Sequence, residues 1–123
     1  MKQRTLNLIK LAHNLDLKYL AAQLTQLGQE ADLIAEKFDE KNQNNKKSQE
    51  ISILCNDVRS SFQALKENVS PKSLNSLKLS LNKLMFLVNK LGQITHDSIL
   101  KQMIYSSVVT IYQRVLEQLN AAS

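Results

Sequence analysis

Residues 70–92, SPKSLNSLKLSLNKLMFLVNKLG, decide the fold of this chain. Apolar side chains recur in this stretch at alternating intervals of three and four residues, which is the spacing of one face of an α-helix. This seam consists of Leu74, Leu77, Leu81, Leu84, Val88 and Leu91. Ser70 can cap the first turn, and Pro71 suits the first helical position. The stretch therefore predicts an amphipathic helix over about residues 71–91.

Three further stretches have the same apolar spacing and predict helices over about residues 5–38, 48–69 and 96–119. The polar stretch 39–47 has no such pattern and predicts a loop. Four amphipathic helices with mostly short connections indicate an all-α fold, namely an antiparallel up-down four-helix bundle with a long first helix. The alternative is a three-helix core with a projecting N-terminal helix.

Three residues are expected to mark helix ends or breaks. Gly92 is placed to end the third helix in a left-handed conformation. Thr95 is expected to cap the fourth helix. Gly28 falls inside the long first helix and is expected to weaken it or break it.

The composition of the 123-residue chain also favours a small helical protein. It contains two glycines and one proline, whereas β-sandwiches, barrels and nucleotide-binding folds need turn glycines and glycine-rich loops. The length predicts a single helical domain over residues 1–123. No apolar run approaches the roughly 18 residues of a membrane span, and one cysteine, Cys55, cannot form an internal disulfide framework. We therefore expect a soluble, cytoplasmic protein.

Few residues of this chain are of the kind that carries chemistry. His13 falls in the apolar seam of the first helix and is expected to be a core or interface residue, while His96 begins the last helix. Neither has a partner at metal-ligand spacing. Cys55 lies on an apolar seam, where its thiol is expected to be neutral and unreactive. The sequence predicts a protein that is not an enzyme, with no cofactor, no metal ligand set and no small-molecule substrate.

Three of the predicted helices carry more apolar side chains than one buried stripe requires. In the first helix the second stripe consists of Leu8, Leu11, Leu15, Tyr19 and Ala22. In the third helix the face opposite the leucine seam carries Leu79 and Phe86, flanked by Lys72, Lys83 and Lys90. In the fourth helix the apolar face is extended by Tyr105, Val109, Tyr112 and Leu116. Each set is a candidate interaction surface, with burial between neighbouring helices as its alternative.

The surplus apolar surface, together with the lack of catalytic motifs, predicts a helical protein–protein interaction module. An adaptor, a chaperone-like protein or a regulatory protein that self-associates, as a homodimer, fits this pattern. A second hypothesis is binding to a membrane surface by the basic, amphipathic first helix. A third, weaker hypothesis is nucleic-acid binding by the lysine face of the third helix, although the arginines are dispersed and no recognition motif occurs.

Overall fold

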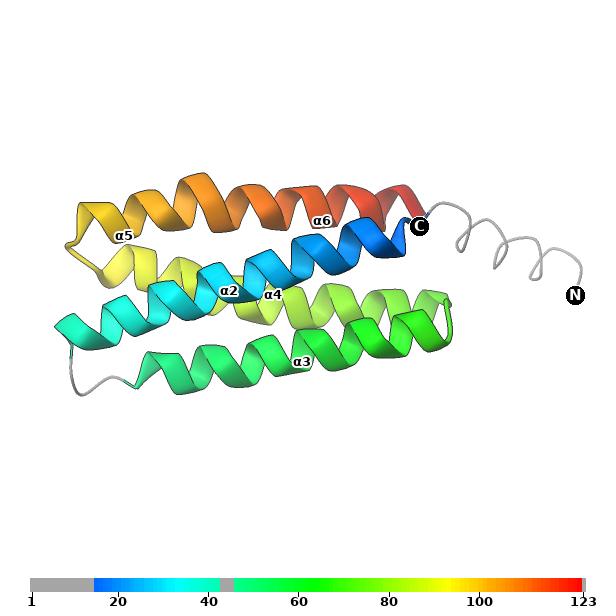
Figure 1. The fold of residues 1–123 in the computed structure, drawn as a ribbon, viewed down its shortest axis with the longest axis horizontal. Helices are drawn as coiled ribbons and strands as arrows, with labels where there is room; N and C mark the ends of the chain where they lie inside the picture. Colours follow the sequence, from blue (N-terminus) through cyan, green and yellow to red (C-terminus); the bar gives the residue numbers. More distant parts are fainter. Residues whose placement is uncertain (1–14, 43–45, 123) are drawn as a thin grey trace, which may run out of the picture.

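The computed structural model describes residues 15–42 and 46–122, which form a bundle of four long helical segments (Figure 1). The first three segments are α2 (Leu17–Lys41), α3 (Lys47–Glu67) and α4 (Pro71–Ile94). The fourth, which we call the C-terminal helix, runs without interruption through α5 (Ser98–Met103), the π-helical turn η1 (Ile104–Val108) and α6 (Val109–Ala122). Consecutive segments run in opposite directions in Figure 1, and the described residues contain no strand. The predicted all-α bundle is confirmed.

The apolar seams of the four segments meet in one shared core. Every residue of the α4 seam is buried, as are the apolar side chains along the centre of the C-terminal helix. The largest fully buried side chains are Leu20, Leu27, Ile34, Ile51, Leu65, Leu74, Leu77, Leu81, Leu84, Leu91, Leu100 and Ile104. Because complete burial of one such side chain stabilises by about 1.5–3 kcal/mol, packing rather than helix propensity holds the segments together.

α2 is an integral member of this bundle. It packs against α3, α4 and the C-terminal helix. Asp16 caps its first turn by accepting a hydrogen bond from the backbone N–H of Tyr19 at 3.0 Å, and the helix continues through Gly28 without a break. The break expected at Gly28 is therefore wrong, and the segment Leu17–Lys41 does not project from a three-helix core. Residues 5–14 of the first predicted helix lie outside the described residues.

A carboxylate of α2, that of Asp39, caps the first turn of α3 across the loop that connects the two helices. Lys46 precedes α3 in a left-handed conformation with φ 47° and provides no side-chain cap. Instead, the backbone N–H groups of Lys47 and Ser48 donate to Oδ1 and Oδ2 of Asp39, each at 2.8 Å. The predicted loop 39–47 is consequently shorter, because α2 continues to Lys41 and α3 begins at Lys47.

The same contacts set the charge state of Asp39. Burial works to raise its pKa, but hydrogen bonds from Ser48 and Lys47, together with the Lys47 charge, outweigh burial and hold the pKa below its usual 3.8. A lowered pKa means that the charged carboxylate is more stable in the folded protein than in the unfolded chain. The resulting stabilisation is complete above the unfolded pKa and is lost as the pH falls through the folded pKa.

We expect Asp39→Asn to flatten the acid limb of the stability profile. At neutral pH the variant should lose about 1 kcal/mol, because the amide has one acceptor oxygen for two N–H groups. As the pH falls from about 4 through the lowered pKa of Asp39, the stability of the variant should approach that of the parent protein, because the parent then loses the charge. Urea unfolding at a series of pH values measures this. Some acid sensitivity should remain, because the hydrogen bond from Lys41 lowers the pKa of Asp97 in the same direction. The exposed Asp57→Asn is the control and should follow the parent curve.

The junction of α4 and α5 differs from the sequence-based expectation. Gly92 does not end α4 in a left-handed conformation: its φ is not positive, and the helix continues to Ile94 with Thr95 as its C-cap. The N-cap of α5 is Asp97, whose Oδ1 accepts hydrogen bonds from the N–H groups of Ile99 at 2.8 Å and Leu100 at 3.3 Å. Thr95 accepts a hydrogen bond from Asp97 N–H at 3.2 Å and does not cap α5 itself.

Gly92 has a packing role instead. It is buried, and a Cβ atom at this position would lie 3.2 Å from Ile104 Cδ1 and 3.3 Å from the Tyr105 hydroxyl oxygen. These distances are tighter than ordinary van der Waals contact. The missing side chain therefore lets the C-terminal helix approach α4 closely at the beginning of η1. At the other end of α4, the predicted cap is confirmed: Ser70 accepts from Ser73 N–H at 3.1 Å, and Pro71 is the first helical residue.

Candidate interaction surface and pocket

The outer face of α4 carries two large apolar side chains that the fold leaves uncovered. Phe86 is 74% exposed and Leu79 is 57% exposed, although both belong to the helix whose opposite side forms the centre of the core. They lie seven residues apart and so share a face, with about 10 Å between them along the helix axis. We call this pair, with its flanking lysines, the α4 face; its residues are Leu79, Phe86, Lys72, Lys83 and Lys90.

All charged residues of the α4 face are positive. All three flanking lysines are exposed, and every charged residue of α4 is a lysine. The ion pairs recorded among the described residues join Lys41 to Asp97 and Lys47 to Glu50, so they involve none of the lysines of this face. The α4 face is thus an apolar pair bordered by positive charge without carboxylate neighbours on its own helix.

Side chains of the C-terminal helix border the α4 face. The Tyr112 hydroxyl donates a hydrogen bond to Oδ1 of Asn82, which lies one helical turn before Phe86. Tyr105 is 53% exposed and lies over Gly92, about one and a half turns after Phe86. Tyr112 therefore lies beside the α4 face, whereas Tyr105 lies against the buried side of α4 at Gly92. Burial raises the pKa of Tyr112, which keeps its hydroxyl protonated as a donor.

The other predicted surface residues are less available. Val109, Tyr112 and Leu116 are only partly exposed, and Val109 and Tyr112 pack against the core, so they border the surface more than they form it. In α2, Tyr19 is partly buried, and Leu15, just before the helix, is 7% exposed and belongs to the core. The prediction that Leu15 belongs to an interaction surface is therefore wrong, because its side chain is buried in the core. Leu8, Leu11 and His13 lie outside the described residues.

Four exposed apolar side chains were not singled out by the sequence: Leu33, Ile53, Ile94 and Ile99. No spacing pattern in the sequence distinguishes any of them from an ordinary surface residue. Ile53 lines a shallow pocket together with Lys90 of the α4 face, so Leu33, which is 41% exposed on α2, is the better control for Phe86.

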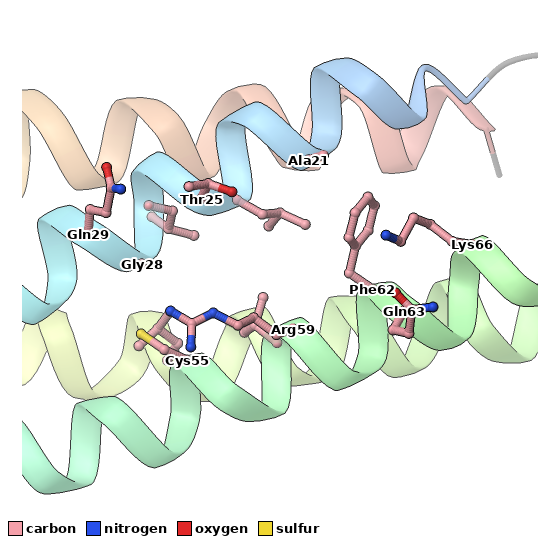
Figure 2. A pocket seen from close by; sticks show the side chains of 13 residues that line it. Ala21, Thr25, Gly28, Gln29, Cys55, Arg59, Phe62, Gln63 and Lys66 are labelled. Carbon is pink, nitrogen blue, oxygen red and sulfur yellow. The ribbon is translucent and has the colours of Figure 1, made fainter.

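A pocket of about 320 Å³ lies between α2 and α3, and the sequence did not reveal it (Figure 2). Its apolar lining includes Leu24, Leu27, Val58, Phe62 and Leu84, and its polar lining includes Thr25, Gln29, Arg59, Gln63 and Lys66. Gly28 and Cys55 complete the wall at one end, where Gly28 leaves space that a side chain would fill. A pocket between two helices depends on how they pack, so no residue pattern in the sequence of either helix predicts it.

Cys55 in this wall is a protonated thiol. Its pKa is raised to about 12, mainly by burial and also by the neighbouring Asp32 carboxylate, while the positive charge of Arg59 acts in the opposite direction. The neutral state predicted for this thiol agrees with that value, since a thiolate is the nucleophilic form. Within the described residues, no group of three or more His, Cys, Asp or Glu side chains is arranged to hold a metal ion.

Comparisons with protein-family models, with curated proteins and with solved structures gave no match. Across residues 15–42 and 46–122, none of the helices combines the length and the apolar content that crossing a membrane requires.

Proposed function

We propose that this chain is a non-enzymatic, cytoplasmic interaction module that binds a protein partner through the α4 face. The observation that carries the proposal is the 74% exposure of Phe86, one heptad from the exposed Leu79. Large apolar side chains at the centre of a contact, surrounded by charged ones, are typical of binding hot spots and their rims. The cytoplasmic location is part of the proposal, because the single cysteine is a free, buried thiol.

The chemistry of the α4 face favours an acidic amphipathic helix as the partner. An exposed helix face with apolar residues at heptad spacing suits a second helix that lays its own apolar stripe along it. Because the charges of α4 are all positive, glutamates or aspartates beside that stripe would complement Lys72, Lys83 and Lys90. A nucleic-acid backbone would engage the lysines but leave Phe86 and Leu79 in water, so the apolar pair favours protein.

The charge of the α4 face also bears on whether the predicted homodimer could form through it. Two copies of α4 packed against each other would bring lysines close to lysines, and like charges in a contact are unfavourable. Self-association through this face should therefore be weak at low salt and strengthen as salt screens the repulsion. An acidic partner should show the opposite salt dependence. Light scattering at two salt concentrations separates the two cases.

We expect a labelled synthetic helix with leucines at heptad spacing and flanking glutamates to bind this protein, as measured by fluorescence anisotropy. A matched peptide with lysines in place of the glutamates should not bind. Phe86→Ala should weaken binding of the acidic peptide by about 30-fold, equivalent to roughly 2 kcal/mol. Leu33→Ala removes an exposed apolar side chain from α2 and should leave the affinity unchanged.

Both variants change exposed residues, so their circular dichroism and thermal unfolding should match those of the parent protein. Equal binding of the two peptides, or unchanged affinity in Phe86→Ala, would remove the α4 face from the proposal. A dimer that Phe86→Ala converts to a monomer would instead identify the partner as a second copy of this chain.

A further inference from the structure

The pocket between α2 and α3 lies on a different part of the bundle from the α4 face and has its own chemistry. Its floor is apolar, because Leu27, Val58 and Leu84 are all buried core residues. Phe62 and Lys66 close one end: the Lys66 ammonium lies over the Phe62 ring, 5.2 Å from its centroid. Figure 2 shows both side chains extending from α3 beside the gap that separates it from Ala21 on α2.

The opposite end of the pocket carries a guanidinium group with donors to spare. Nη1 of Arg59 donates to Oδ1 of Asn56 at 2.8 Å, an exposed contact within the same helix. Nη2 faces Gly28, where a Cβ atom would be 3.9 Å away. No Asp or Glu belongs to the pocket lining in the described part of the chain. Neither of the ion pairs found there includes Arg59, and the Asp32 carboxylate near this end of the pocket is hydrogen-bonded to the Cys55 thiol.

We propose that this pocket binds a single-chain anionic amphiphile, a medium-chain alkyl carboxylate, with its carboxylate on Arg59 and its chain over the apolar floor. A guanidinium fork matches the two oxygens of a carboxylate. Gln29 and Thr25 line the same end and offer further donors. The alkyl chain would run past Leu24 and Val58 toward Phe62. This inference is independent of the proposed interaction function, since no residue of the α4 face lines the pocket.

The size of the pocket restricts the ligand to a small one. About 320 Å³ is at the lower end of the roughly 300–1,000 Å³ typical of ligand pockets. A two-chain lipid or a nucleotide cofactor exceeds this space, whereas one extended alkyl chain fits. Lys66 lies seven residues after Arg59, about 10 Å along α3, so it contributes positive potential at the other end rather than a second contact to the same carboxylate.

Isothermal titration with decanoate, below the concentration at which it forms micelles, tests the proposal. The parent protein should bind one decanoate, and 1-decanol, which has the same chain without the charge, should bind at least tenfold more weakly. Arg59→Gln should weaken decanoate binding at least tenfold and leave the decanol affinity unchanged. Lys66→Gln should have a smaller effect, and Arg59→Lys an intermediate one, because lysine keeps the charge but not the fork.

Two variants keep this test decisive. Gly28→Leu projects a side chain into the pocket and should abolish decanoate binding, while circular dichroism confirms that the helices remain. Arg114→Gln removes the same charge from an exposed position on α6 and should bind like the parent. The proposal is overturned if the parent does not bind decanoate, if decanol binds equally well, or if Arg59→Gln and Arg114→Gln behave alike. Binding of the acidic helix to the α4 face should be the same with and without decanoate.

Discussion

Leu84→Ala should lower the free energy of unfolding by about 2–5 kcal/mol, the range measured for leucine truncation in well-packed cores. Leu84 is 1% exposed and belongs to the α4 seam, so the removed methyl groups leave a hole among α2, α3 and α4. It also forms part of the floor of the α2–α3 pocket, so the hole should enlarge that pocket. Guanidinium unfolding followed by circular dichroism measures the loss.

Leu79→Ala is the matched control for this change. It is the same substitution in the same helix, five residues earlier, and alanine is the slightly better helix former in both places. Leu79 is 57% exposed, so its truncation should change stability by no more than about 0.5 kcal/mol. Equal losses in the two variants would mean that α4 is rotated about its axis relative to the arrangement described here, and would also contradict the exposure of the α4 face.

The helices and their buried faces could be predicted because they depend on local spacing. Six apolar residues at intervals of three and four define one side of α4, and the opposite side follows from helix geometry. The exposure of Leu79 and Phe86 could be predicted for the same reason, because both lie opposite the buried seam of α4. The Ser70–Pro71 boundary was also local, since the cap and the first turn are adjacent in sequence.

The features that the sequence did not reveal all depend on contacts between different helices. Asp39 caps α3 across a loop, which no capping pattern at the start of α3 indicates. The pocket exists only because α2 and α3 lie side by side with Gly28 between them. Val109 and Tyr112 pack partly against the core of the bundle. Their spacing in the sequence is the same whether they pack in this way or form an exposed interface, so it could not distinguish the two.

The two glycines illustrate this limit and give the second large effect. Both lie inside helices without a positive φ, so an L-residue fits either backbone conformation, and replacement should gain about 1 kcal/mol of helix propensity at each. Their surroundings differ. At Gly28 the nearest side-chain atoms to a Cβ are 3.9 and 4.0 Å away, whereas at Gly92 they are 3.2 and 3.3 Å away.

Gly92→Leu should therefore destabilise the protein by about 3 kcal/mol, while Gly28→Leu should change its stability by less than about 1 kcal/mol. Tyr105 is half exposed and can swing away from a new side chain, but Ile104 is fully buried and cannot, so the C-terminal helix must separate from α4 near η1. Thermal unfolding of the two variants beside the parent measures the difference. The same loss at both glycines would contradict the close contact of Gly92 with Ile104 and Tyr105. A loss at Gly92 alone would establish that this residue is small because of a neighbour in space and not because of a helix end.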